Sequence, residues 1–127
     1  WHNYYEKSVR YRVEDVAKDK DGKPRVYAKF KGVLPAGRVY DCCWEVMNNR
    51  YVDDDMDRLL DMGLNGILHM DVTSAEDPMP CHDPRHPNSR AGMIRWQKII
   101  GEKARRRPIR SATGCCRFSR SSTTASS

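Results

Sequence analysis

Long hydrophobic runs are absent from this chain, and their absence excludes a membrane-spanning helix. The 127 residues are 39% hydrophobic and 31% charged. No apolar run approaches the roughly 20 residues that a helix needs to cross a bilayer. The sequence therefore predicts no transmembrane segment. The chain begins with Trp1 instead of Met, from which we expect either a precursor that has lost an organellar transit peptide, in a mitochondrion or plastid, or a trimmed chain.

Several motifs of enzymes and nucleotide-binding proteins are also missing. The sequence contains no G-x-x-x-x-G-K-[ST], G-x-G-x-x-G or G-x-S-x-G. This excludes the common phosphate-loop, dinucleotide-binding and hydrolase-elbow interpretations. Cys43 and His69 could form a nucleophilic pair on neighbouring strands, but an unreactive buried cysteine is as simple an interpretation. We therefore predict a protein that is not an enzyme and binds no cofactor.

The cysteines do not form a disulfide framework. There are five, and four of them lie in adjacent pairs, Cys42-Cys43 and Cys115-Cys116, with Cys81 alone between the pairs. The number is odd, and adjacent cysteines rarely bridge each other because the geometry is strained. A reducing compartment is therefore favoured.

A short segment with the sequence CHDPRH, at residues 81–86, could bind zinc. The candidate ligands are Cys81, His82 and His86, with Cys42 or Cys43 brought in from the predicted sheet. Thiols and imidazoles are suitable ligands for this metal. However, the chain has no Cys-x-x-Cys pair, and Pro84 within the segment, with Pro87 directly after it, argues against a helix that would place both histidines on one face. An exposed polar loop without metal is the alternative.

Alternation of apolar and polar residues predicts strands in the N-terminal half. We expect them at residues 9–13, 26–30 and 38–46, joined first by an Asp-Gly turn at residues 19–24. A short helix from Asp53 to Gly63 and a fourth strand at residues 67–72 complete a β-β-β-α-β order. The predicted fold class is α+β, with a small antiparallel sheet in a body that covers residues 1–75.

The predicted short helix begins in a cluster of acids. The cluster consists of Asp53, Asp54, Asp55, Asp57 and Asp61. Such carboxylates could hold a divalent cation for phosphate-ester chemistry. Acids at a helix start also cap the backbone and complement the helix dipole, and we prefer this second interpretation.

The C-terminal part changes in composition. Four prolines between residues 76 and 89 predict a connector. Residues 90–107 follow as a longer amphipathic helix, capped by Asn88 or Ser89, with Met93, Trp96 and Ile100 on its inner face. Residues 108–127 form an extended tail rich in Arg and Ser, which we expect to be disordered unless bound.

Positive charge gathers at this end. From Ser89 onward there are ten Lys and Arg against one acid, within a total net charge of +6. Arginine suits bidentate contact with phosphate. The residues predicted to bind RNA or a partner are Arg95, Lys98, Lys103, Arg105, Arg106, Arg107, Arg110 and Arg117. A solvated charged face, or contact with an acidic protein or lipid surface, is the alternative.

These observations lead to three functional hypotheses. The first is a structural subunit of a larger assembly, an organellar ribosome or another ribonucleoprotein, held by its basic helix and tail and contacting neighbouring protein subunits. The second is a linker or accessory subunit of a respiratory or photosynthetic complex. The third is a small zinc-binding module.

Overall fold

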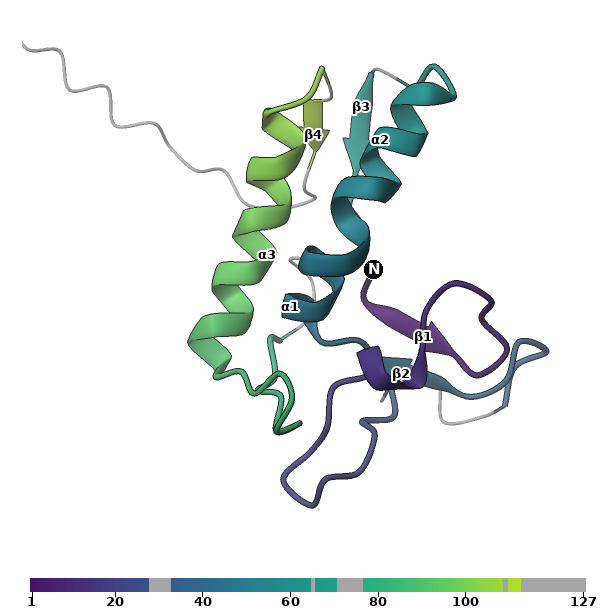
Figure 1. The fold of residues 1–127 in the computed structure, drawn as a ribbon, viewed down its shortest axis with the longest axis vertical. Coiled ribbons are helices and arrows are strands. Elements are labelled where there is room, and N and C mark those ends of the chain that lie inside the picture. The colour runs from purple at the N-terminus through teal and green to yellow at the C-terminus, as the bar shows by residue number, and fades with distance from the viewer. Residues whose placement is uncertain (28–32, 65, 71–76, 109, 113–127) are drawn as a thin grey trace, which may run out of the picture.

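The computed structural model describes residues 1–27, 33–64, 66–70, 77–108 and 110–112. Two small sheets and a set of helices make up the fold (Figure 1). The elements follow in the order β1 (Asn3–Tyr5), a 3₁₀ helix η1 (Val13–Asp15), β2 (Val39–Asp41), α1 (Trp44–Met47), a π-helical turn η2 (Asn48–Val52), α2 (Asp53–Asp61), β3 (Ile67–His69), α3 (Arg90–Arg105) and β4 (Arg110–Ala112). The predicted α+β class and the predicted C-terminal helix are confirmed.

The N-terminal sheet is antiparallel, as predicted, but its first strand lies elsewhere. β1 pairs with β2, with Tyr4 opposite Tyr40. The strand expected at residues 9–13 is wrong, because Val9 is fully exposed and the chain there enters η1. The physical reason is local: the Ser8 hydroxyl accepts hydrogen bonds from the backbone of the following turn. Side chains that bond to nearby backbone in this way compete with a strand ladder.

The other two predicted N-terminal strands are only partly found. Val26 forms an isolated bridge with Tyr40, and the rest of the segment expected at residues 26–30 lies mostly outside the described residues. The strand expected at residues 38–46 ends at Asp41, and a helix starts at Trp44. Aromatic and β-branched residues here gave a misleading strand signal, because they are buried by a helix instead.

One continuous helical segment replaces the predicted short helix. α1, η2 and α2 follow one another without a break from Trp44 to Asp61. Its buried side includes Met47, Val52 and Met56, all fully buried. Gly63, at φ +84°, follows the end of α2, as the sequence predicted.

The C-terminal part forms a strand–helix–strand unit. β3 pairs in parallel with β4, with Leu68 opposite Ser111. α3 connects the two strands and lies beside α1 and η2 (Figure 1). The fourth predicted strand exists at Ile67–His69 but does not join the N-terminal sheet. Parallel pairing requires a long crossover connection, which α3 supplies.

The core lies between α3 and the continuous helical segment. Met93 and Ile100 on α3 are buried there, as predicted, and Trp96 packs partly buried against the same cluster. The Ser89 hydroxyl caps α3 by accepting a hydrogen bond from the backbone N–H of Gly92, at 3.1 Å. Cys43 and Cys81 belong to this core cluster, so the core also positions a chemically reactive group of side chains.

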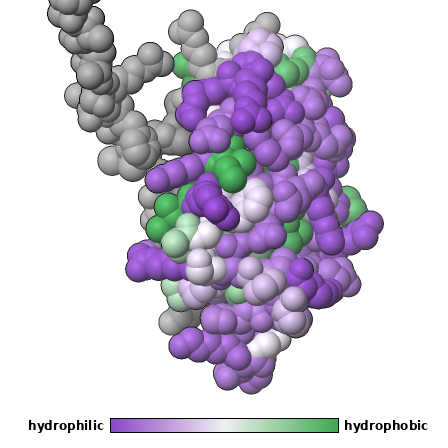
Figure 2. Space-filling model, turned by 60° about the vertical axis from the view of Figure 1, so that its left-hand side comes forward, coloured by the Kyte–Doolittle hydropathy of each residue, from purple (hydrophilic) through white to green (hydrophobic). Residues whose placement is uncertain are grey.

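The surface seen in Figure 2 is mostly hydrophilic, with small hydrophobic areas between polar side chains. Scattered apolar side chains of this kind are normal on a folded protein. Within the described ranges, no helix has the length and apolar character to span a membrane.

Candidate functional site

A closed loop between β3 and α3 carries two of the site's side chains. The backbones of Cys81 and Asn88 exchange two hydrogen bonds, each 2.8 Å long. Between them the backbone N–H of His86 donates to the carbonyl of Asp83, at 3.1 Å. Pro84 restricts the chain within this turn. Pro84, which argued against a helix, therefore helps a loop to hold Cys81 and His86 together.

A buried carboxylate forms ion pairs that stabilise the same loop, and one of these pairs joins the loop to the N-terminal part. The Asp83 carboxylate is fully buried and lies 2.7 Å from Arg85 Nη2 and 3.0 Å from Lys18 Nζ. Hydrogen bonds from Arg85 hold the pKa of Asp83 far below its ordinary value. The backbone N–H of His82 also donates to the carbonyl of Lys18, at 2.9 Å. The loop is therefore held both by its own contacts and by contacts with Lys18.

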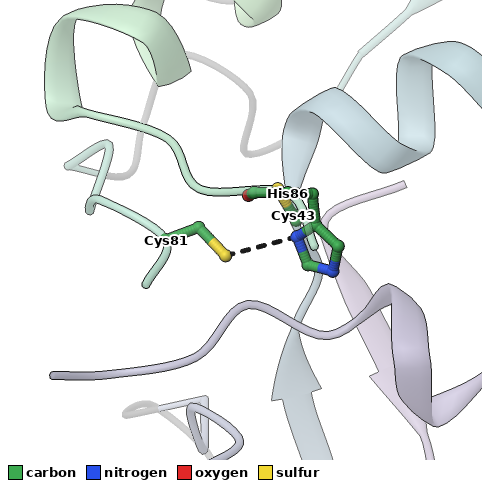
Figure 3. A group of neighbouring side chains, drawn as sticks. All are labelled: Cys43, Cys81 and His86. Carbon is green, nitrogen blue, oxygen red and sulfur yellow. Dashed lines mark hydrogen bonds between the residues drawn. The ribbon is translucent and has the colours of Figure 1, made fainter. Parts of the chain in front are cut away.

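The third side chain comes from the junction of β2 and α1. Cys43 immediately precedes α1, and its backbone N–H donates to the carbonyl of Asp15 at 2.9 Å. Its thiol faces Cys81 and His86, so that the two sulfurs and a ring nitrogen all lie within 4.8 Å of one another. Figure 3 shows the three side chains pointing toward one another. All three residues are buried. We call this group the Cys43–Cys81–His86 cluster.

The imidazole of His86 is held from both sides. Its Nδ1 lies 3.5 Å from the sulfur of Cys81, and its Nε2 lies 3.0 Å from the carbonyl oxygen of Glu14. A carbonyl oxygen only accepts, so Nε2 carries the proton in this contact. In the neutral ring, Nδ1 then has a free lone pair directed at the thiols.

The two thiols of the cluster are electrostatically coupled. A hydrogen bond from Cys43 lowers the pKa of Cys81 below its ordinary value, and the backbone N–H of Asp83 acts in the same direction. The same thiol–thiol contact, together with burial, raises the pKa of Cys43. The pair therefore favours one thiolate on Cys81, and thiolate is the form that binds metals and reacts as a nucleophile.

A hollow of about 200 Å³ adjoins the cluster. Its polar lining consists of Glu14, Glu45, Asn49, Arg50, Arg85 and His86. Glu45 is tied to the loop, because its carboxylate accepts a hydrogen bond from the side-chain amide of Asn88. His86 therefore belongs to the buried cluster and also lines the hollow.

The structure selects among the ligands that the sequence proposed. Cys81 and His86 come together, and of the two adjacent cysteines it is Cys43 that joins them. Cys42 points into a second core cluster, with Met47 among its neighbours, and His82 is exposed. The local sequence does not show which of these candidate ligands come together; only the tertiary structure does. His69 is exposed on β3 while Cys43 is buried, so the nucleophilic pair considered for them is wrong.

Two of the cations predicted to bind RNA are engaged within the molecule. Lys103 Nζ lies 2.5 Å from Asp53, and Arg107 lies 2.9 Å from Asp53 and 2.6 Å from Asp57. Arg95, Lys98, Arg105 and Arg106 have exposed side chains. Arg117 and the side chain of Arg110 lie outside what the structure describes. For these residues, partner binding stays a prediction.

The acidic cluster has a different role from the predicted capping. α2 continues from η2, and no side chain caps it. Asp53 instead pairs with Lys103 of α3, and Asp53 and Asp57 both pair with Arg107 just after α3. Asp54 and Asp55 each lie 2.5 Å from Arg10. The acids therefore hold neighbouring elements together by ion pairs across the fold.

Together these features define a mixed α+β domain whose core holds two thiols and an imidazole. Its fold is similar to part of the alpha-N-acetylgalactosaminidase NagBb from Bifidobacterium bifidum. The quadruple mutant and the GalNAc complex of that protein each match with a TM-score of 0.72 and 19% identity, over 89% of this chain and 18% of theirs. The ligand-free form matches with a TM-score of 0.72 and 18% identity, over 88% of this chain and 18% of that one. No family model matches the sequence, and neither does any curated protein.

The chain thus spans about a fifth of the length of the solved structures that it matches. This likeness contradicts the predicted function. The assignment to a ribosome or other ribonucleoprotein is wrong. The two alternatives for the function of the whole chain, an accessory subunit of a respiratory or photosynthetic complex and a small zinc-binding module, are contradicted as well. The prediction relied on cations gathered at one end of the sequence, and two of them are neutralised by acids of α2.

Proposed function

We propose that the chain is part of a carbohydrate-active protein of the glycoside hydrolase type. The observation that carries this proposal is the shared fold, at a TM-score of 0.72 over 89% of the chain. The likeness extends over nearly all of this chain. A short shared motif would not give such coverage.

The order of elements in the C-terminal part supports the same proposal. β3, α3 and β4 form a parallel strand–helix–strand unit. In α/β folds built from such units, binding and catalytic residues gather in the loops that follow the strands. The segment that follows β3 contains the closed loop between Cys81 and Asn88. This closed loop therefore lies in the connection where such folds place their sites.

We further propose that this chain contributes to sugar recognition and is not itself a catalyst. Glycoside hydrolysis commonly needs two carboxyl groups on opposite sides of the scissile bond. The two carboxylates that line the hollow are Glu14 and Glu45, and Glu45 is held by Asn88. The hollow, about 200 Å³, is smaller than the roughly 300–1,000 Å³ of a drug-sized pocket and suits a single sugar ring. Carboxylate, amide and guanidinium groups provide the hydrogen bonds that sugar hydroxyls require.

Titration of the purified chain with sugars tests this proposal. We expect N-acetylgalactosamine to shift backbone amide NMR signals of residues around the hollow, and glucose to shift them less. Replacement of the exposed Asn49 by Ala should weaken the response, because an amide partner is lost. We expect no release of nitrophenol from 4-nitrophenyl α-N-acetylgalactosaminide.

Two results would contradict the proposal. If no sugar in a panel of hexoses and N-acetylhexosamines shifts any signal of the folded protein, sugar recognition is wrong. If the isolated chain hydrolyses the nitrophenyl glycoside, the noncatalytic role is wrong.

A further inference from the structure

We propose that the Cys43–Cys81–His86 cluster binds a zinc ion. The ligand atoms would be the two sulfurs and Nδ1 of His86, the atoms that already face one another in Figure 3. This inference goes beyond the proposed function and does not depend on it, because it rests only on the geometry of the three side chains.

The spacing of the ligand atoms fits a tetrahedral ion. With Zn–S about 2.3 Å and Zn–N about 2.0–2.1 Å, two ligands at a tetrahedral angle lie about 3.6 Å apart. The sulfur of Cys81 and Nδ1 of His86 are 3.5 Å apart. The largest separation among the three ligand atoms stays within 4.8 Å. A zinc ion therefore requires only small side-chain adjustments.

The imidazole is already oriented for metal binding. A histidine that binds a metal usually donates its other ring N–H to a carbonyl or carboxylate, which fixes the tautomer. Here Nε2 lies 3.0 Å from the carbonyl oxygen of Glu14, and a second acceptor, Asp83 Oδ2, lies 3.6 Å away. In the tautomer that donates from Nε2, the lone pair of Nδ1 faces the two sulfurs. The supporting contacts of a metal site are thus present on η1 and on the loop.

The chemistry of the donor atoms also suits zinc. Two thiolates and a neutral imidazole balance the double charge of zinc in a buried place. The donor set contains no carboxylate, and hard cations such as calcium and magnesium prefer oxygen ligands. Sulfur and nitrogen donors select zinc among the abundant divalent ions.

The fourth position would be taken by water. A zinc site with three protein ligands keeps one position open, and His86 also lines the hollow that opens to the surface. Water and zinc can enter from that side. Bound zinc would join the loop after β3 to the start of α1, two segments far apart in the sequence, and would hold one wall of the hollow in place.

Zinc titration of the purified full chain provides the first test. We expect one zinc ion per chain by elemental analysis. We also expect cobalt to give the intense visible and near-ultraviolet absorption of a tetrahedral thiolate complex. Zinc should protect two of the five thiols from alkylation, and mass spectrometry should identify them as Cys43 and Cys81.

Matched variants provide the second test. Cys43→Ser, Cys81→Ser and His86→Gln should each weaken zinc binding by more than the roughly 10- to 100-fold that outer contacts contribute. Cys42→Ser and His82→Gln are the controls. Cys42 is the equally buried neighbour of Cys43, and His82 lies on the same loop as His86. Both control variants should bind zinc as the unaltered chain does.

Three results would overturn the proposal. The first is an absence of zinc or cobalt binding to the folded chain at micromolar metal. The second is equal loss of binding in the Cys42→Ser control. The third is a disulfide between Cys43 and Cys81 in protein purified without reductant that reduction does not convert into a zinc-binding form. The alkylation pattern of the unaltered chain decides the matter even if the Ser variants fail to fold.

Discussion

Two regions of the molecule use polar groups in opposite ways. The Cys43–Cys81–His86 cluster is buried, contains few polar atoms, and directs them at one point. The interface between α2 and the end of α3 has more charge, but the carboxylates of Asp53 and Asp57 are 51% and 58% exposed, so water reaches their ion pairs with Lys103 and Arg107. Exposed ion pairs contribute little to stability, because water and salt screen them. Density of charge is therefore a poor guide to a functional site, and convergence of buried donors is a better one.

Among the changes that test this comparison, zinc binding to the Cys43–Cys81–His86 cluster should have the largest effect on stability. At a free concentration about 1,000 times the dissociation constant, a ligand that binds only the folded state stabilises it by about 4 kcal/mol. We expect zinc to raise the melting temperature of the unaltered chain and of Arg107→Met, but not that of Cys81→Ser. Differential scanning calorimetry with zinc or with a chelator measures this. An equal zinc response in Cys81→Ser would show that the ion acts elsewhere.

Loss of a buried carboxylate next to the cluster should have the second largest effect on the free energy of unfolding. Asp15 is fully buried and accepts hydrogen bonds from Arg50 at 2.6 Å, Tyr51 at 2.5 Å and the backbone of Arg12 at 2.8 Å. Asp15→Ala leaves these donors unpaired, and we expect a loss of about 2 kcal/mol in the free energy of unfolding.

Urea denaturation of Asp15→Ala measures that loss. Glu14→Ala is the matched control, because Glu14 is the neighbouring acid and its side chain is exposed. The control should unfold at nearly the same urea concentration as the unaltered chain. Equal destabilisation by both substitutions would contradict the prediction that the buried, hydrogen-bonded carboxylate of Asp15 contributes more to stability than the exposed one of Glu14.

The α2–α3 interface should respond weakly to substitution. Arg107→Met removes the ion pairs with Asp53 and Asp57 but keeps most of the apolar stem, so we expect a loss within about 1 kcal/mol. A double-mutant cycle with Asp57→Asn, followed by urea denaturation at low and high salt, isolates the pair. A coupling of several kcal/mol that salt does not reduce would show that this interface is as important as the buried cluster.

Acid should reduce the small stability difference between the unaltered chain and Arg107→Met. Hydrogen bonds from Arg107 lower the pKa of Asp57 below its ordinary value. A carboxyl whose pKa is lowered by folding stabilises the protein above its unfolded pKa, about 3.9, and this contribution is lost as the pH falls through the folded value. The difference in unfolding free energy between the unaltered chain and Arg107→Met should therefore be present at pH 7 and smaller at pH 3. A difference that grows on acidification would contradict this assignment.

Local patterns in the sequence determined several features correctly. Spacing of Met93 and Ile100 and the capping Ser89 predicted α3, because helix periodicity and caps depend on residues three or four apart. The Asp-Gly turn was also correct: Gly22 has φ +75°, and Asp19 Oδ1 accepts hydrogen bonds from the backbone of the turn. The failed strand at residues 9–13 shows the limit of such patterns. Backbone N–H groups there donate hydrogen bonds to the side chains of Ser8 and Asp15 instead of to a neighbouring strand.

What the sequence determined by itself is the class of the fold, its long C-terminal helix and the presence of thiol and imidazole groups. Only the tertiary structure decided that Cys43 faces Cys81 and His86 while Cys42 faces Met47, and that β3 pairs in parallel with β4. It also decided that Lys103 and Arg107 meet acids of α2. The physical reason is range: periodicity and capping act between near neighbours, whereas these contacts join residues far apart in the chain and depend on how whole elements pack.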